Sequence, residues 1–467
     1  MRDLRRLLLL LALSLVALAR AGSAALGPRY GGEITVGVRR LPARALVPWL
    51  PRGDGDPVVT ALVHEGLVRL DLNGLHAPGL AARWSAAAGA REWQLELAAD
   101  ARFHDEEPVT AEDAVRSLRR FLRSPSPAAA RLAASLDGGA AYRRGAGEEL
   151  PGLAALDGRR VSLRFPEARA VPLAPLAAPA AAVVGPRGQG CGPFVPALHV
   201  PGRSLAVTAF GSHVRGRPYL DRLTLKVSAD AAAARADLRD GRLDVALGEP
   251  GESRVTDTLI LLLDPSRPPF DRPSSRDAVA GAVTAAAIAA LLSGATSAPG
   301  LLSPLLLPSA APLPAPSGPP PSGAITLAVR DDVPPLASQR VVASLDALGL
   351  RTTVRPVRTD AVTTARAQAR LFLWSPELPE AGLALLELSA LAPHSRVARD
   401  AVDASEWELD LDRRRAALAE AEAALRAEAV LVPLCLAPAS FAVRQGVHGA
   451  RLDAAGRLLL EDAWIEP

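Results

Sequence analysis

The chain has few residues of the kinds on which catalysis, metal binding and disulfide frameworks depend. Its 467 residues include two cysteines, one methionine, seven scattered histidines and only 4% aromatic residues. No segment has the spacing of a nucleophile elbow, a zinc-protease helix or a phosphate-binding loop. Cys191 has no basic pair nearby in sequence that would activate its thiol. We therefore expect a protein that is not an enzyme and that holds no metal and no cofactor.

Excess charge of one sign is also missing. The formal net charge is +3, and residues 1–24 alone hold four arginines and one aspartate, so acidic and basic residues balance over the rest of the chain. A nucleic-acid surface requires a clustered basic face. The sequence therefore predicts no nucleic-acid partner.

The first 24 residues have the pattern of a secretory signal peptide. A basic start, MRDLRR, precedes an apolar run from Leu7 to Ala19, and small residues from Ala21 to Ala24 offer a cleavage site. The competing interpretation is an uncleaved anchor, but the run is shorter than the roughly 20 residues that span a bilayer. No cysteine follows the run for lipid attachment. We expect a soluble periplasmic protein that is cleaved near Ala24.

Residues 92–122 show a strand, a turn and a capped helix in succession. Trp93, Leu95 and Leu97 alternate with polar residues, as in a half-buried strand. Thr110 can cap a helix whose first turn is acidic, and a Ser-Pro pair ends it. The apolar face of this helix is predicted to hold Ala114, Val115, Leu118, Phe121 and Leu122.

This strand, the segment F-H-D-x-x-P-x-T-A-E-D and the helix resemble the extracellular solute-binding proteins of family 5, the dipeptide- and oligopeptide-binding receptors of ABC importers. Other blocks also match family signatures. They are GGEITVGV at 31–38, VHEGLVRLDLNGLHAPGLAARW at 63–84, CGPF at 191–194, GRPYLDRLTLKV at 216–227, ADLRDGRLDVALG at 236–248, and the segments 417–438 and 447–465.

The resemblance implies an α/β, two-lobed periplasmic-binding-protein fold of type II, in the large peptide-binding subclass, with mixed sheets and an interlobe cleft that closes on a ligand. It implies a discontinuous first lobe, 25–262 plus 430–467, and a second lobe, 263–429. The implied partners are a small-molecule or peptide ligand and an ABC permease in the inner membrane. We expect a monomer.

The second lobe carries several local predictions. The apolar run Thr258–Leu263 indicates a buried strand, and the Ala-rich segment 278–292 indicates one buried helix of about four turns. The proline-rich segment 299–323 is predicted to be an extended or disordered connector, dispensable for stability. A strand at 324–329, a helix at 339–348 and a strand at 351–357 follow.

The candidate ligand site comes from the resemblance. Peptide-binding relatives place an acidic residue three positions after a tryptophan, where it pairs with the α-ammonium of the ligand. Here Trp374 is followed at that spacing by Glu377, and Leu378 stands where relatives have an aromatic residue. We predict that these three residues bind the ligand. A solvated loop glutamate is the alternative for Glu377.

The two cysteines of an exported chain can form a disulfide. Cys191 and Cys435 each lie at a predicted strand in blocks that the resemblance assigns to one lobe. We predict that they are bonded, the alternative being two buried thiols that never meet.

The chain also departs from the family pattern. It lacks the Tyr-Trp pair expected within 210–218, and the proline-rich segment replaces a helix that relatives carry. The leading interpretation is a periplasmic receptor that hands a small, peptide-like ligand to an ABC import permease. The alternative is a drifted member that serves as a non-transport interaction or sensory module. The sequence leaves the ligand open among peptides, nickel complexes and oligosaccharides.

Overall fold

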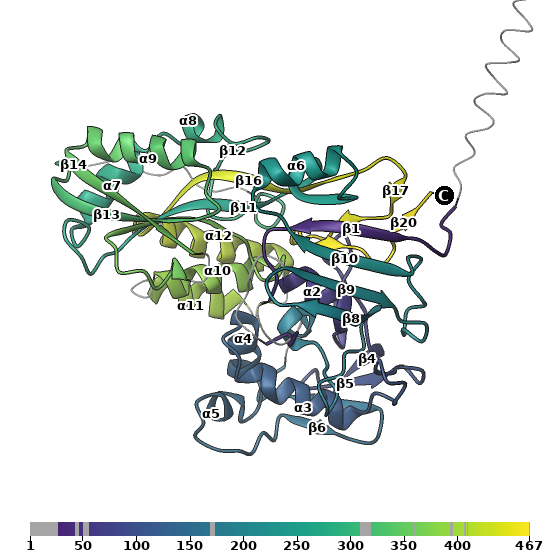
Figure 1. Ribbon diagram of the computed structural model, residues 1–467. Coiled ribbons are helices and arrows are strands. Elements are labelled where there is room, and N and C mark those ends of the chain that lie inside the picture. The colour runs from purple at the N-terminus through teal and green to yellow at the C-terminus, as the bar shows by residue number, and fades with distance from the viewer. Residues whose placement is uncertain are drawn as a thin grey trace, which may run out of the picture.

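The computed structural model describes residues 27–42, 46–49, 56–168, 173–308, 319–358, 361–392, 396–405, 408 and 410–466, and it has two lobes (Figure 1). The predicted leader, 1–24, lies outside these residues. We use "second lobe" for the part built around residues 273–427, and "first lobe" for the part built around residues 33–239. Among the described residues, no helix is long and apolar enough to cross a membrane.

One ten-stranded sheet extends through both lobes, in the order β14-β13-β15-β11-β1-β10-β9-β8, and β16 pairs with β11 and β12. Its strands are β1 (Glu33–Val38), β8 (Phe194–Val200), β9 (Ser204–Ala209), β10 (Arg222–Val227), β11 (Val245–Leu263), β12 (Thr296–Ser297), β13 (Gly323–Arg330), β14 (Leu350–Val357), β15 (Ala369–Trp374) and β16 (Leu431–Val443).

The long strands β11 and β16 join the lobes. They pair antiparallel from Val245↔Val443 at one end to Leu262↔Leu431 at the other, with register shifts between. The N-terminal part of β11 pairs with β1 of the first lobe, and its C-terminal part pairs with β15 of the second. The predicted boundaries at 262 and 430 fall at one end of this strand pair, and they stay predictions.

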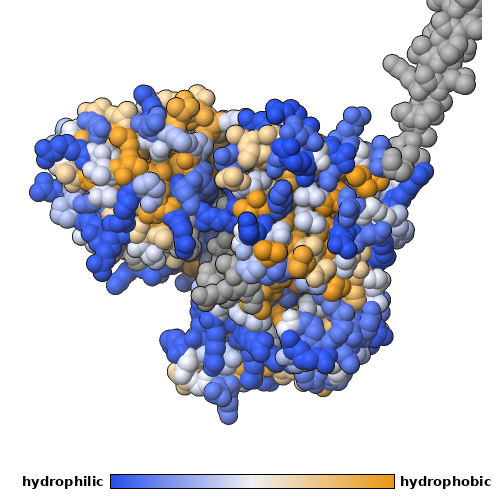
Figure 2. Space-filling model, viewed as in Figure 1, coloured by the Kyte–Doolittle hydropathy of each residue, from blue (hydrophilic) through white to orange (hydrophobic). Residues whose placement is uncertain are grey.

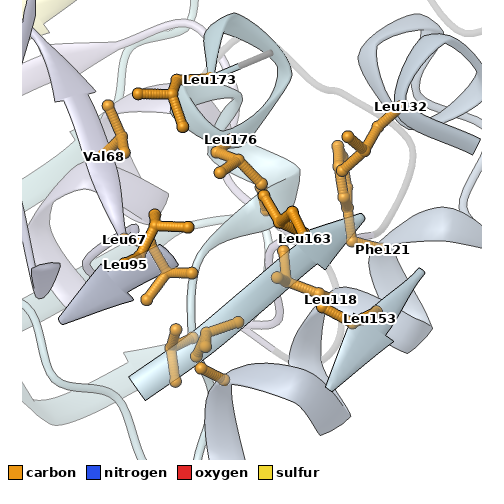
Figure 3. Packing of buried hydrophobic residues seen from close by; sticks show 14 of the residues in the cluster. Leu67, Val68, Leu95, Leu118, Phe121, Leu132, Leu153, Leu163, Leu173 and Leu176 are labelled. Atoms are coloured by element: carbon orange, nitrogen blue, oxygen red, sulfur yellow. The ribbon is translucent and has the colours of Figure 1, made fainter. Parts of the chain in front are cut away.

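The lower part of the first lobe in Figure 1 contains a second sheet, β4-β5-β7-β6, covered by helices. Its elements are β4 (Ala81–Ala87), β5 (Glu92–Leu97), β6 (Leu153–Ala155), β7 (Arg160–Arg164), α3 (Ala111–Leu122), α4 (Pro127–Ser135) and α5 (Gly139–Arg143). Figure 3 shows Phe121 and Leu118 of α3 meeting Leu163 of β7 and Leu132 of α4 in one core. The strand, turn and capped helix predicted at 92–122 are confirmed.

The remaining elements of the first lobe complete its upper part and the chain end. They are α2 (Asp56–Val63), β2 (Val68–Leu70), β3 (His76–Pro78), α6 (Ala231–Arg239), β17 (Val447–His448), β18 (Arg451–Leu452), β19 (Leu458–Leu459) and β20 (Trp464–Ile465), with 3₁₀ turns at Ala174–Ala177 and Pro179–Ala181. Ile34, Val36 and Val38 of β1 belong to the core of this upper part.

Helices cover both faces of the sheet in the second lobe. Leu259, Leu261 and Leu263 of β11 pack with α7–α9, and the alternate residues Ile260 and Leu262 pack with α10–α12. These helices are α7 (Pro273–Ala282), α8 (Ala285–Ala289), α9 (Pro335–Ala347), α10 (Ala381–Leu391), α11 (Arg396–Ser405) and α12 (Leu411–Ala427). The buried strand predicted at 258–263 is confirmed.

The single helix predicted at 278–292 is wrong. The segment is divided between α7 and α8, because Val283 and Thr284 have extended backbones, with ψ angles of 102° and 100°. Both residues are β-branched, which lowers their helix propensity and favours such a break.

The prediction that 299–323 is an unpacked connector is also wrong for its first part. Leu301, Leu302 and Leu307 are buried in the core beside α10–α12. The backbone N–H groups of Leu301 and Leu302 both donate to Glu422 Oε1, at 2.6 and 3.2 Å. Prolines prevent regular structure here, yet Leu301, Leu302 and Leu307 still fill the core. Residues 309–318 lie outside the described residues.

The predicted disulfide is not formed in the structure. Cys191 and Cys435 are both free and buried. Cys191 lies in the core of the lower first lobe, whereas Cys435 lies on β16 in a core cluster of the second lobe. The two blocks that carry the cysteines therefore pack in different hydrophobic cores.

Candidate ligand-binding site between the lobes

The carboxyl ends of β1, β13 and β15 meet where the lobes face each other. β13 and β15 run parallel, as do β1 and the start of β11. Ligands of open α/β sheets bind outside the carboxyl ends of the strands. Figure 2 shows the surface hollowed between the second lobe and the lower first lobe. We therefore take the residues that follow these strand ends as the candidate site.

Charged residues from the two lobes pair at these strand ends. Arg40, just after β1, forms an ion pair with Asp331, just after β13. Arg39 Nη1 lies 3.9 Å from Asp332 Oδ2, and Arg330 holds the same carboxylate through Nε and Nη2 at 2.5 and 2.6 Å. The charges of both lobes are thus largely matched here, which favours a ligand that is neutral or zwitterionic.

Asp257 is an exception to this matching. It lies on β11, where the pairing with β16 shifts register, and it accepts hydrogen bonds from Ser375 and from Thr256 Oγ1, the latter at 3.0 Å. Its partners are hydroxyl groups, and no ion pair of Asp257 is found within the described residues. Burial raises the pKa of Asp257 above its usual range, and the charge of Arg330 only partly opposes this.

Glu377 follows β15, and its carboxylate accepts hydrogen bonds from the first lobe. Ser126 Oγ lies 2.9 and 2.8 Å from the two carboxylate oxygens, and Ala128 N donates to Oε2 at 3.1 Å. The backbone N–H of Glu377 donates to Glu387 Oε1 at 2.8 Å. Only 4% of Glu377 is exposed. It is therefore not a solvated loop residue.

The two neighbours of Glu377 in the prediction are buried as well. Trp374 lies in the core of the second lobe beside α10–α12. Leu378 is fully buried, and it packs in the core of the lower first lobe together with residues of α3 and α4. The structure thus places Glu377 and Leu378 at the contact between the lobes and Trp374 in the core of the second lobe. Their contacts with a ligand stay predictions.

Sequence reasoning missed Arg39, Arg40, Asp257, Asp331 and Asp332. A usable signal was present, because each charged pair directly follows an apolar strand that had been recognised, at 31–38 and 324–329. Asp257 had no such signal, since a lone aspartate before the apolar run that starts at Thr258 does not stand out. The pairing between residues 291 positions apart could not be inferred from one sequence.

The fold and the charged interlobe surface define a solute-binding protein of the two-lobed periplasmic type. The family model of the bacterial extracellular solute-binding proteins, family 5, matches residues 76–378. The chain belongs to this family, which is one of binding proteins.

Solved structures share this fold over nearly the whole chain. The murein tripeptide binding protein MppA of Escherichia coli has 18% identity and a TM-score of 0.81, covering 94% of this chain and 99% of its own. OppA of Haemophilus influenzae in complex with RPPGFSPFR has 17% identity and a TM-score of 0.79, with the same coverage. DppA of Helicobacter pylori in complex with the peptide STSA has 15% identity and a TM-score of 0.79, again with the same coverage. No curated protein sequence matches the chain.

Proposed function

We propose that this protein is a periplasmic receptor that binds a peptide-like ligand between its lobes and delivers it to an ABC import permease. The observation that carries the proposal is the family match over 76–378, on a fold whose charged strand ends face each other across the lobes. In this proposal the leader is cleaved near Ala24, the receptor acts as a monomer, and it catalyses no reaction.

The ligand class rests on two considerations. The descriptions of three structures with this fold name peptide ligands: a nonapeptide, a tetrapeptide and a murein tripeptide. The present chain offers two carboxylates, Glu377 at the lobe contact and Asp257 on β11, either of which can pair with an ammonium group. A relative from Staphylococcus aureus is described in complex with Ni(L-His)₂, so metal complexes belong in the same test.

Thermal stability in the presence of candidate ligands tests this function. A ligand that binds only the folded protein adds about 2.7 kcal/mol to the free energy of unfolding at 100 times its Kd. We expect members of a short-peptide library to raise the melting temperature, and their N-acetylated counterparts to raise it less. If neither the peptides nor the nickel–histidine complex changes the melting temperature, the proposed function as a receptor for peptide-like ligands is wrong.

Two conservative variants identify the residue that binds the ammonium. Loss of one partner of a desolvated charge pair costs about 2–5 kcal/mol of affinity. We expect Glu377→Gln or Asp257→Asn to weaken binding of a peptide found in the library by this amount. The acetylated peptide serves as the control, since it lacks the ammonium group and so reports any change in affinity that does not come from the lost charge pair. If both variants bind the free peptide normally, neither residue is the anchor.

One observation favours the second candidate, a drifted module without transport. The carboxylate predicted to receive the ligand already has its hydrogen-bond donors within the chain. A protein that binds none of the tested solutes but retains a stable fold would fit this second function.

A further inference from the structure

The contact of Glu377 with α4 connects the two lobes. Ser126 and Ala128 begin α4, whose residues Ala129 and Leu132 lie in the core of the lower first lobe. Glu377 lies 251 positions later than Ser126, between β15 and α10 of the second lobe. In Figure 1, α4 lies directly below α10 and α11. Any movement that separates the lobes here must break this contact.

The start of α4 needs an external acceptor. Its first turn contains no acidic residue, and Pro127 stands at its first position. Ser126 Oγ already accepts from Ala129 N at 3.2 Å, so this hydroxyl can still donate its single proton. Glu377 accepts that proton and the N–H of Ala128. A carboxylate at a helix N-terminus is also favoured by the helix dipole.

Contacts on both sides fix the backbone that carries the Glu377 carboxylate. The backbone of Glu377 is bonded to the Glu387 side chain of α10, and the adjacent Leu378 is buried in the first-lobe core. An ion pair between Arg131 of α4 and Asp403 of α11, at 3.3 Å, adds a second link nearby. Hydrophobic packing, hydrogen bonds and charge therefore act at one place between the lobes.

We propose that Glu377, Ser126 and Ala128 form an interlobe latch that keeps the lobes together before any ligand is bound. The latch goes beyond the proposed function, because it acts in the ligand-free protein whatever the ligand is. It also gives Glu377 a role in setting the lobe equilibrium that is separate from contact with a ligand. A ligand that requires separated lobes must compete with this contact.

The distance between the lobes in the ligand-free protein tests the latch. Leu156 in the lower first lobe and Leu336 in the second are 45% and 60% exposed, so cysteines introduced there can carry spin labels. The native Cys191 and Cys435 are buried and should not be labelled. Pulsed electron paramagnetic resonance on the Leu156→Cys, Leu336→Cys protein should give one narrow distance distribution, the closed-state distance.

The same measurement on latch variants gives the decisive comparison. Glu377→Gln puts an amide against the N–H of Ala128, and Ser126→Ala removes the hydroxyl donor. We expect either change to raise the ratio of separated to closed molecules about tenfold, since hydrogen bonds to charged groups are among the stronger ones. Ser126→Ala also guards against a folding defect that is specific to Glu377→Gln.

Glu422→Gln is the matched control. Glu422 is also a buried glutamate that accepts two backbone N–H groups, but its partners Leu301 and Leu302 lie in the same lobe. This variant should keep the closed-state distance of the parent protein. The proposal is overturned if Glu377→Gln and Ser126→Ala are folded and keep the closed-state distance, or if the parent protein already has separated lobes without ligand. Neither outcome bears on whether peptides bind, which the melting experiment decides.

Discussion

Two neighbouring helices of the first lobe begin in the same way but obtain their carboxylate from different places. The hydroxyl of Thr110 caps α3, and Asp113, three residues later, accepts from the Thr110 N–H at 3.0 Å. The hydroxyl of Ser126 caps α4, and the carboxylate there comes from Glu377 in the other lobe. One helix start is complete within a single turn of chain, whereas the other is complete only when the lobes meet.

The comparison separates stability within a lobe from the coupling between lobes. A local capping box stabilises its helix whether or not the lobes are closed. A cap that is supplied from 251 positions away stabilises the closed arrangement alone. Variants of remote contacts should therefore reveal functions that variants of local contacts cannot.

The largest expected effect concerns another remote contact, the packing of the proline-rich segment. Leu301→Ala should lower the free energy of unfolding by about 2–5 kcal/mol, because it removes a fully buried side chain from the second-lobe core. Urea denaturation measures the loss. Leu305→Ala is the control, since Leu305 is 71% exposed and its change should be within about 0.5 kcal/mol. If both variants change the free energy of unfolding equally little, the segment is an unpacked connector.

A second remote effect concerns charge at His64. Burial lowers the pKa of His64 from 6.5 to about 4, and its Nε2 lies 2.6 Å from Leu46 O. A folded-state pKa below the unfolded value gives stability that is present above pH 6.5 and lost as the pH falls towards 4. The loss is about 3 kcal/mol.

Unfolding by urea at pH 7 and at pH 4 measures this loss. We expect the parent protein to lose about 3 kcal/mol more than His64→Gln over this range. His448→Gln is the control, because His448 is exposed, with its ring stacked on Trp464 and its Nε2 3.1 Å from Oε1 of the exposed Glu466. A parent protein and His64→Gln variant with parallel pH profiles would contradict the buried neutral state of His64.

These effects show why part of the structure could be predicted from the sequence. The strand at 92–97, the cap at Thr110 and the apolar face of α3 depend on neighbours within about one turn, and all were correctly predicted. The burial of Leu301 depends on α12, more than 100 residues away, and composition alone suggested a connector. Prolines exclude a helix, but they do not exclude a packed, irregular segment.

The candidate site shows the same limit. Family resemblance singled out Glu377, whose side chain joins the lobes, because the spacing of the motif is local. Ligand contacts of Glu377 and Trp374 stay predictions. The resemblance could not reveal that Ser126 and Ala128 donate hydrogen bonds to the Glu377 carboxylate, since that contact joins segments with no shared pattern. Asp257 was passed over because an isolated aspartate before an apolar run has no distinguishing signal of its own.

The caps themselves give a third, smaller effect. Thr110→Ala should cost about 1 kcal/mol in the free energy of unfolding, the usual loss for a helix cap. Ser126→Ala removes a cap and also leaves the buried Glu377 short of a donor, so we expect a larger loss, about 2–3 kcal/mol. In the Glu377→Gln protein, the loss in free energy of unfolding caused by Ser126→Ala should come closer to the loss caused by Thr110→Ala. An additive result would show that Ser126 and Glu377 are not coupled.

The smallest expected effect is that of a reducing agent, which should leave the melting temperature unchanged. Burial raises the pKa of the Cys435 thiol to about 12 and that of the Cys191 thiol even further, so both should resist alkylation in the native protein. The two thiols lie in cores of different lobes, and a bond between them would tie the lobes together independently of the latch. Alkylation of periplasmic protein that is denatured without reductant should modify both cysteines, as counted by mass spectrometry. If the protein is alkylated only after reduction, Cys191 and Cys435 form a disulfide after all, and the lobes are linked covalently.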